Sequence, residues 1–505
     1  MSPNVTGPRV AVIGAGFGGL ALAIRLQSAG IATTLIEARD KPGGRAYHWK
    51  DQGFTFDAGP TVITDPACID ELFALSGRER ADYVDFIPIS PFYRLLWPDG
   101  AEFDYVNDQG RLDCQIEARN PADVAGYRRF LQFSEAVYDE GYKRLGHVPF
   151  LKVTDMLAAA PQLMKLQAWR SVYSKVSAFV SDDHLRQALS FHTLLVGGSP
   201  FAASSIYALI HALERDGGVW FARGGTNALV AGLARLFEDI GGRLIVSDPV
   251  QRIEVEGGKV TGIRHADGTV ETFDAVASNA DIVHTYDHLL RGAARGKSVG
   301  RSLKRRRFSP SLFVVHFGLK RTHPELAHHT IVFGPRYKGL IDEIYGKNGL
   351  ADDFSLYVHA PSVSDPSVAP EGCSAYYALS PVPHLGTANV DWDVEGPKYA
   401  DRILASLEQR LIPGLREDLV TRRIFTPKDF ERELNAWQGS AFSLEPILTQ
   451  SAWFRTHNRD DVIPNMYFVG AGTHPGAGVP GVIGSAKATA GLMIADLGAH
   501  WGGST

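Results

Sequence analysis

The chain is poor in cysteine. It has three cysteines in 505 residues, and Cys68, Cys114 and Cys373 lie far apart without a CxxC pair. A disulfide framework or a thiolate metal site needs several cysteines at suitable spacing, so neither is predicted. This usage fits a reducing compartment.

A long unbroken apolar run is also absent. Gln187–Leu213 and Val462–Ala486 carry no Lys, Arg, Asp or Glu, but glycine and proline interrupt both stretches. Because a membrane-spanning helix needs about 20 consecutive apolar residues, none is predicted. The first residues lack a basic segment ahead of an apolar run, so no signal peptide is predicted either.

The sequence has no excess of basic charge. The formal net charge is −5, which gives no general attraction to nucleic acid. A content of 45% hydrophobic and 21% charged residues is typical of a soluble globular protein. The length predicts roughly two to four domains.

The amino-terminal segment carries a glycine motif between a strand and a helix. Val10–Ile13 is a short apolar run, and Gly14, Gly16 and Gly19 form GxGxxG at the start of an apolar helical face that Gly30 can end. In such a motif the first glycine makes the tight turn and the second admits a pyrophosphate. The third lets helix and strand pack closely.

An acidic residue completes this motif. A second apolar strand, Thr33–Ile36, is followed by Glu37, which lies about 20 residues beyond the glycines and can accept a hydrogen bond from a ribose hydroxyl. Strand, glycines, helix, strand and acid together predict a dinucleotide site. They do not separate FAD from NAD.

Two further segments separate the two cofactors. Gly43 and Gly44 precede Arg45, and a DAGPT segment ends in Gly59, Pro60 and Thr61. The guanidinium of Arg45 can pair with a pyrophosphate, and the glycines let the loop lie over it. This arrangement resembles the FAD-dependent amine oxidase and carotenoid desaturase superfamily.

The resemblance extends along nearly the whole chain. Segments such as "LQAWRSVYSKV", "LLVGGSPFAASSIYALIHALER", "GVWFARGGTNALV", "PVPHLGTANVDW" and "VGAGTHPGAGVPGVIGSAKATAGLM" resemble bacterial-type phytoene desaturases. The implied fold is α/β, with a discontinuous Rossmann-like FAD-binding domain, a mixed-sheet substrate domain and a helical subdomain that faces substrate and membrane. We expect the FAD-binding domain to comprise residues 1–80, 216–290 and 453–505. The substrate domain is expected to comprise residues 81–120 and 300–452, and the helical subdomain residues 121–215.

The glycine-rich segment Phe468–Val482 has no explanation in the amino-terminal motif. By resemblance it returns to the flavin ring, and a helix beginning near Val482 points its N–H groups at the pyrimidine end. Val250 is expected to contact the adenine end through its backbone. The full expected cofactor-binding set is Gly14, Ala15, Gly16, Phe17, Gly18, Gly19, Glu37, Ala38, Gly43, Gly44, Arg45, Gly59, Pro60, Thr61, Val250, Gly470, Gly472, Gly481 and Val482.

The implied activity is the FAD-dependent desaturation of 15-cis-phytoene, a hydrophobic C40 polyene, to all-trans lycopene. The flavin accepts a hydride, a proton leaves to a side chain or water, and oxygen or a quinone is the final acceptor. The alternatives are a desaturase with another number of steps, a polyene isomerase or saturase, an amine oxidase, and a flavin-free escort protein for prenylated GTPases. The intact glycine motifs argue against the escort protein.

Two residues are candidates for acid–base catalysis. His474 lies inside the carboxy-terminal glycine segment, and Glu445 lies in "SAFSLEPIL", which leads toward that segment. The alternatives are a hydrogen-bonded structural histidine and a paired glutamate.

A water-insoluble substrate suggests peripheral contact with a lipid surface, at the cytoplasmic face of the cell membrane. Two segments are candidates for this contact. Arg291–Arg307 holds eight basic residues and no acidic ones, and Gln187–Leu213 is uncharged. The alternative for the basic segment is a solvated surface loop. The alternative for the uncharged stretch is a set of core helices around a substrate tunnel.

Overall fold

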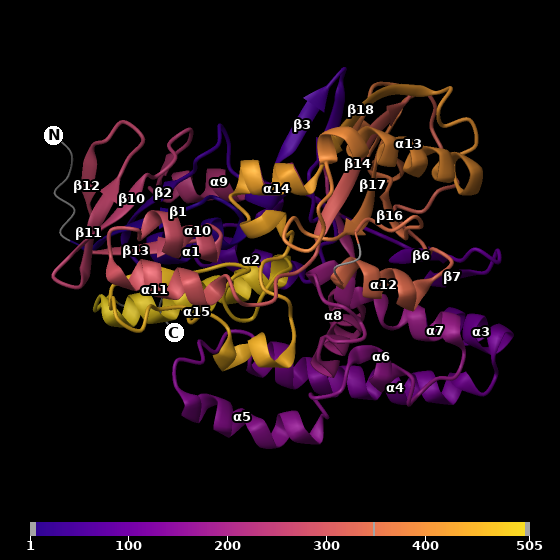
Figure 1. Cartoon of the computed structure of the whole chain (residues 1–505), viewed down its shortest axis with the longest axis horizontal. Coiled ribbons are helices and arrows are strands. Elements are labelled where there is room, and N and C mark those ends of the chain that lie inside the picture. The colour runs from indigo at the N-terminus through magenta and orange to yellow at the C-terminus, as the bar shows by residue number, and fades with distance from the viewer. Residues whose placement is uncertain (1–6, 347–348, 500–505) are drawn as a thin grey trace.

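A computed structural model describes residues 7–346 and 349–499. Residues 1–6 and 500–505 of the expected FAD-binding domain, and residues 347–348 of the expected sheet domain, lie outside the described residues. Figure 1 shows a parallel-sheet unit at one end of the molecule, a wide second sheet at the other end, and a group of helices beneath that second sheet. This arrangement has the α/β class that the sequence predicts.

The first sheet has five parallel strands drawn from distant parts of the chain. The apolar run of its central strand is buried on both faces, as is typical of parallel sheets. In spatial order the strands are β9 (Arg243–Ile245), β2 (Ala32–Ile36), β1 (Arg9–Ile13), β13 (Ala275–Ser278) and β19 (Met466–Phe468).

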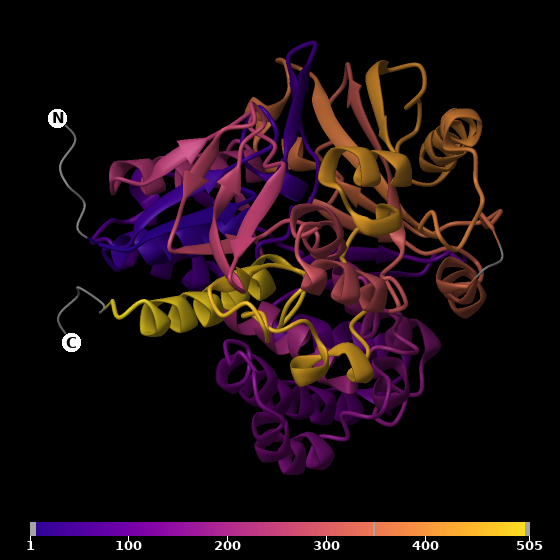
Figure 2. The same ribbon diagram turned by 60° about the vertical axis from the view of Figure 1, so that its left-hand side comes forward.

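Three helices pack on this sheet. They are α1 (Phe17–Ser28), α9 (Thr226–Asp239) and α15 (Val479–Asp496). Figure 2 shows α15 running beside the amino-terminal unit, and it packs along α1. The carboxy-terminal segment therefore returns to the glycine motif at the start of the chain. A three-stranded antiparallel meander is attached to this unit and comprises β10 (Arg252–Glu256), β11 (Lys259–Arg264) and β12 (Val270–Thr272).

The second sheet has seven strands, and only β15 and β6 pair in parallel. Helix α13 (Trp392–Arg410) covers one face. In spatial order the strands are β18 (Leu419–Phe425), β14 (Ser311–Leu319), β17 (Ser374–Val382), β16 (Leu356–His359), β15 (His329–Val332), β6 (Tyr93–Leu96) and β7 (Glu102–Tyr105). Its neighbouring strands β14, β17 and β16 are rich in aromatic and β-branched residues, which are favoured in sheets.

The helical group lies against the other face of this sheet. The uncharged stretch Gln187–Leu213 is mostly buried there, so it forms core around a cavity and not a surface contact. The helices are α3 (Gln109–Arg119), α4 (Asp123–Tyr138), α5 (Val153–Lys165), α6 (Val172–Val176), α7 (Asp183–Ala188) and α8 (Leu209–Gly217).

Shorter elements connect these units. They are α2 (Pro66–Ala74), β3 (His48–Asp51), β4 (Phe54–Asp57), β5 (Phe86–Pro88), β8 (Trp220–Ala222), α10 (Ile282–His284), α11 (Ala294–Leu303), α12 (Tyr337–Tyr345) and α14 (Pro427–Leu434). Among the described residues, no helix combines the length and the hydropathy needed to cross a bilayer.

The basic segment is a helix and not the loop that the charge run suggests. Helix α11 forms most of the segment Arg291–Arg307, and three basic side chains of this segment are neutralised by acidic partners. Arg295 pairs with Asp460, Lys304 with Asp287 and Arg307 with Glu445. Tertiary acidic partners thus remove part of the charge that the sequence concentrates here.

Candidate functional site

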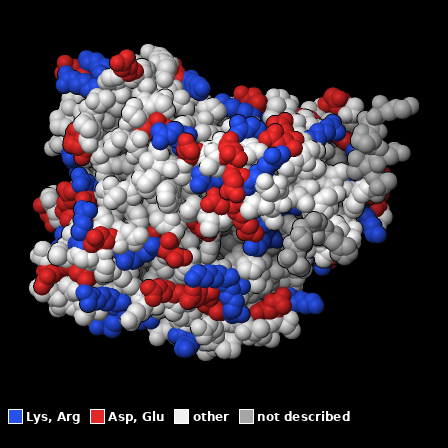
Figure 3. All heavy atoms as spheres, turned by 180° about the vertical axis from the view of Figure 1, so that it is seen from behind, with Lys and Arg blue, Asp and Glu red and all other residues white. Residues whose placement is uncertain are grey.

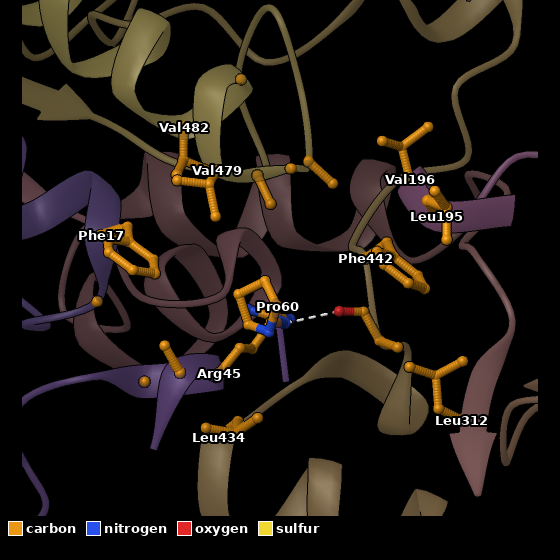
Figure 4. A pocket seen from close by; sticks show the side chains of 18 of the residues that line it. Phe17, Arg45, Pro60, Leu195, Val196, Leu312, Leu434, Phe442, Val479 and Val482 are labelled. Atoms are coloured by element: carbon orange, nitrogen blue, oxygen red, sulfur yellow. Dashed lines mark hydrogen bonds between the residues drawn. The ribbon is translucent and has the colours of Figure 1, made fainter. Parts of the chain in front are cut away.

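A cavity of about 710 Å³ lies between the two sheets and the helical group. Figure 4 shows Phe17, Val479 and Val482 on one side of this cavity, and Leu195, Val196, Leu312 and Phe442 on the other. Arg45 and Pro60 lie between the two sides. The cavity therefore joins a region built from the glycine motifs to a region with apolar walls.

The GxGxxG turn forms one wall of the cavity at the carboxyl end of β1. Gly14 has φ +96°, and its N–H donates to the carbonyl of Ile36 over 2.7 Å. Gly14 and Gly16 line the cavity. A Cβ on Gly19 would overlap the carbonyl oxygen of Gly14. The turn closes only because this third position lacks a side chain.

Glu37 is buried at the end of β2 and lines the same cavity. Its carboxylate accepts from the N–H of Ala15 over 2.8 Å and from the N–H of Arg39 over 3.0 Å. Burial raises the pKa of Glu37, and these two hydrogen bonds oppose the shift. Glu37 thus ties the glycine turn to the second strand while facing the cavity.

Arg45 brings a positive charge into the cavity. Its Nε donates to the carbonyl of Ala441 over 2.6 Å, the bond drawn in Figure 4. Burial lowers the pKa of Arg45, and Asp281 raises it. A guanidinium in such a place is suited to an anionic ligand, because charge-assisted bonds offset the cost of desolvation.

The carboxy-terminal segment supplies the facing wall. Helix α15 begins at Val479, three residues earlier than the sequence suggests, and Gly481 and Val482 line the cavity in its first turn. The helix N-terminus favours negative charge there. A Cβ on Gly481 would lie 2.9 Å from the carbonyl oxygen of Gly476, so the turn has no room for a side chain.

Most of the expected cofactor-binding residues line the cavity. Those that do are Gly14, Gly16, Phe17, Gly18, Glu37, Ala38, Gly43, Gly44, Arg45, Pro60, Thr61, Val250, Gly481 and Val482. Those that do not are Ala15, Gly19, Gly59, Gly470 and Gly472. A Cβ on Gly472 would lie 2.9 Å from the Ile282 side chain, so this glycine serves packing behind the wall.

The two candidate acid–base residues do not line the cavity. His474 donates from Nε2 to the carbonyl of Leu145 over 2.8 Å, and burial lowers its pKa to about 4. Glu445 forms an ion pair with Arg307, and burial raises its pKa to about 7. The structure thus places both residues in structural contacts, since neighbours in sequence need not share a cavity.

A carboxyl group that the motif search missed does line the cavity. Glu214 on α8 is fully buried and accepts from the hydroxyl of Tyr93 over 2.7 Å. His192 Nε2 lies 3.2 Å from its other oxygen. Burial raises the pKa of Glu214 to about 7. One feature of the sequence could have pointed to Glu214: it directly follows the uncharged stretch Gln187–Leu213 and is the first charged residue after it.

Comparison with known proteins decides the family. The profile described as "Flavin containing amine oxidoreductase" matches residues 17–494. The chain belongs to this flavin-containing amine oxidoreductase family. As a member of the family it is an oxidoreductase, and its cofactor is FAD.

Two curated relatives refine this comparison. "Phytoene desaturase (lycopene-forming)" of Pantoea ananas is 64% identical over 486 residues, which is 96% of this chain and 99% of that protein. "Phytoene desaturase (neurosporene-forming)" of Rhodobacter capsulatus is 44% identical over 502 residues, which is 98% of this chain and 96% of that protein.

A solved flavoprotein structure shares the fold. Cyclohexylamine oxidase from Brevibacterium oxydans aligns with a TM-score of 0.64 at 16% identity, covering 97% of this chain and 100% of that one. At this identity the match shows the fold alone.

The residues around the cavity fit FAD. The turn with Gly14 and Gly16 leaves backbone open to a pyrophosphate, and Arg45 supplies the opposite charge. Glu37 stands where a ribose would lie. The first turn of α15, with Gly481 and Val482, would favour the negative charge of a reduced flavin bound in this part of the cavity.

An Arg45→Ala protein is expected to bind FAD about 10- to 150-fold more weakly, because a charge-assisted hydrogen bond is worth about 1.5–3 kcal/mol. Titration of the apoprotein with FAD, followed by flavin fluorescence, measures this. Arg45→Lys keeps the positive charge but lacks the forked donors of a guanidinium, so its FAD affinity should lie between those of the wild type and Arg45→Ala. An Arg45→Ala protein with unchanged FAD affinity would refute the assignment.

Proposed function

We propose that the protein converts 15-cis-phytoene to all-trans lycopene by four successive desaturations. The observation that carries the proposal is the single cavity that joins the FAD-binding region to apolar walls. The higher identity to the lycopene-forming relative than to the neurosporene-forming one favours four steps.

The chemistry follows from the removal of two hydrogens for each new double bond. FAD, when bound, accepts one of them as a hydride. The side chains of Leu195, Val196, Leu312 and Phe442 hold the hydrocarbon and keep water away. The second hydrogen leaves as a proton, which these apolar walls cannot take up.

The experiment is an incubation of flavin-loaded protein with phytoene in liposomes, with oxygen or a quinone as the acceptor. Chromatography should then resolve lycopene as the end product. Accumulation of neurosporene would show three steps, and an isomerised phytoene without new double bonds would contradict desaturation. The acceptor that supports turnover identifies the physiological oxidant class.

We also propose that the protein contacts a lipid surface peripherally, at the cytoplasmic face of the membrane. Support comes from α5, where Val153, Leu157, Pro161 and Met164 recur at helical spacing and are all exposed. Leu157 is 65% and Met164 63% exposed. A row of exposed apolar side chains on an amphipathic helix is typical of interfacial helices.

The surroundings of α5 favour lipid as the occupant. Trp169, just beyond the helix, is 61% exposed, and tryptophan is enriched at membrane interfaces. Lys152 and Lys165 are exposed at the two ends of the helix. Gly141 and Tyr142, in the segment that precedes α5 in the chain, line the cavity, so this part of the helical group extends from the cavity wall to α5.

The charge distribution gives less support to binding through charge alone. On the face shown in Figure 3, basic side chains are interspersed with acidic ones over the described residues. In the basic segment Arg291–Arg307, three basic side chains are already paired with acids. We therefore assign the main contact to α5, with the exposed Arg301 and Arg305 of the basic segment as auxiliaries.

A Leu157→Glu/Met164→Glu protein is expected to lose about 10²-fold in partitioning onto neutral vesicles, because two buried apolar side chains contribute about 3 kcal/mol together. Vesicle flotation at low and high salt measures this. The matched variant Arg301→Ser/Arg305→Ser should retain binding to neutral vesicles. If vesicle binding is instead salt-sensitive and is lost only in Arg301→Ser/Arg305→Ser, the basic segment and not α5 is the main contact.

A further inference from the structure

Three buried histidines form a cluster on the second sheet. His328, His329 and His359 each offer a ring nitrogen, and these three nitrogens lie within 4.8 Å of one another. His329 and His359 are cross-strand partners on β15 and β16. This cluster belongs neither to the glycine motifs nor to the residues that fit FAD.

The cluster is connected to the cavity by a tyrosine. Tyr357 lines the cavity, and its hydroxyl is 2.7 Å from Nδ1 of His329. The same hydroxyl is 3.0 Å from the hydroxyl of Thr61, in the DAGPT segment of the expected flavin site. When the Tyr357 hydroxyl donates to Nδ1, the hydrogen of the neutral His329 ring is on Nε2. That atom is buried without a partner among the described residues.

On its far side the cluster leads toward the surface. Nε2 of His359 is 3.0 Å from Nε2 of His328, and Nδ1 of His328 is 2.7 Å from the hydroxyl of Ser364. Ser364 is half-buried, and its neighbour Val363 is exposed. Hydrogen-bonding groups thus follow one another from the cavity wall to the edge of the molecule, with one gap between His329 and the other two rings. The ring nitrogens across this gap lie within 4.8 Å of one another, a distance that one water molecule can bridge.

We propose that Tyr357 and the three histidines carry the desaturation proton from the cavity to solvent. The inference rests on the desaturation proposed above. When a hydride has left one carbon, the skeleton carries positive charge, and the adjacent C–H bond becomes acidic enough to protonate a hydroxyl oxygen. The electron pair of that C–H bond becomes the new double bond, and FAD holds the hydride.

Each ring can pass the proton on without storing it. An imidazole accepts a proton at one nitrogen and releases another from the second nitrogen. Tyr357 takes the proton at its oxygen while giving its own hydrogen to Nδ1 of His329, and the rings hand it to Ser364 and water. Burial lowers the pKa of His328 to about 3 and those of His329 and His359 well below the ordinary value. The resting rings are therefore neutral, so each ring has one nitrogen that carries a hydrogen and one that can accept a hydrogen bond.

The decisive variant is His329→Ala, assayed as the flavin-loaded protein. We expect normal flavin absorbance and unchanged KM for phytoene, with kcat lowered about 10²-fold, the usual contribution of a positioned proton acceptor. Added imidazole fills the space and should restore kcat at least tenfold, with a dependence on the pKa of the imidazole used. His316→Ala, another buried histidine of this sheet, is the matched control, and imidazole should not restore its activity.

Tyr357→Phe provides an independent test, because it removes only a hydroxyl. We expect a lower kcat and an altered solvent deuterium isotope effect on kcat. The proposal is overturned if flavin-loaded His329→Ala or Tyr357→Phe keeps the wild-type kcat, or if imidazole fails to restore His329→Ala. Stoichiometric divalent metal in the purified protein would also overturn it, because the histidines would then be ligands. Failure of the wild-type protein to desaturate phytoene would be a separate result, concerning the reaction itself.

Discussion

A Gly19→Ala protein should purify without its flavin. The added Cβ would overlap the carbonyl oxygen of Gly14, which is backbone and cannot rotate away. Helix α1 would have to move off the end of β1, and Gly16 would move with it. Overpacking of this kind costs about 3 kcal/mol, which corresponds to a loss on the order of 10²-fold in FAD affinity. The ratio of flavin to protein absorbance and an FAD titration measure the effect.

The control is another glycine in a helix of the same unit. Gly491 lies on α15, is exposed, and a Cβ added there meets nothing within 4 Å. Gly491→Ala should keep its flavin and gain up to about 1 kcal/mol in stability, since alanine is the better helix former. If Gly19→Ala binds FAD as tightly as Gly491→Ala does, the close approach of α1 to the turn is not required for the cofactor site.

A Glu214→Gln protein should be more stable than the wild type at pH 8 and equal to it at pH 4. Burial raises the pKa of Glu214 from its ordinary 4.5 to about 7 in the folded protein. Between these values the unfolded chain loses the proton while the folded protein keeps it, so wild-type stability falls as pH rises through this window. Glutamine resembles the protonated acid and escapes this loss of about 3 kcal/mol.

Chemical unfolding of both proteins at several pH values between 4 and 8 measures this difference. His192, 3.2 Å away, has its pKa lowered to about 3 by burial and is present in both proteins, so its own contribution largely cancels. Glu395→Gln, at a partly exposed carboxylate on α13 that pairs with Lys398 at the surface, is the control and should show no pH-dependent gain, because a surface ion pair contributes little. A difference between wild type and Glu214→Gln that stays constant with pH would show that Glu214 is ionised in the folded protein.

Local sequence predicted the glycine turn well, because the chemistry of such a site lies in consecutive residues. A strand, three glycines, a helix and Glu37 each constrain backbone within a short segment, and backbone requirements can be read from residue type. The return of the carboxy-terminal segment was predicted by resemblance, and Gly481 and Val482 line the cavity in the first turn of α15. The resemblance to known proteins supplied the cofactor's identity and the substrate.

The acid–base candidates could not be placed in the same way. His474 lies within the flavin-lining segment in sequence, yet its ring points to the carbonyl of Leu145. Glu214 carries no motif, but α8 turns it into the cavity beside Tyr93. Which face of a helix or loop meets a cavity depends on packing partners that are hundreds of residues away.

The sequence also could not predict which surface charges are neutralised. The run of basic residues in Arg291–Arg307 is visible in the sequence, whereas Asp287 and Asp460, which neutralise part of it, are brought close only by folding. The apolar face of α5 has ordinary helical spacing, and only the absence of a packed neighbour in the described structure exposes Leu157.

The sequence by itself determined the dinucleotide turn, because this turn depends on backbone conformation within a short stretch. The resemblance to known proteins implied the α/β class and the return of the second glycine segment. The tertiary structure alone decided which side chains share the cavity and which charges are neutralised. It also set the connection from Tyr357 through three histidines to Ser364. Those relations join residues far apart in the chain, and distance in space is set by the packing of whole sheets and helices.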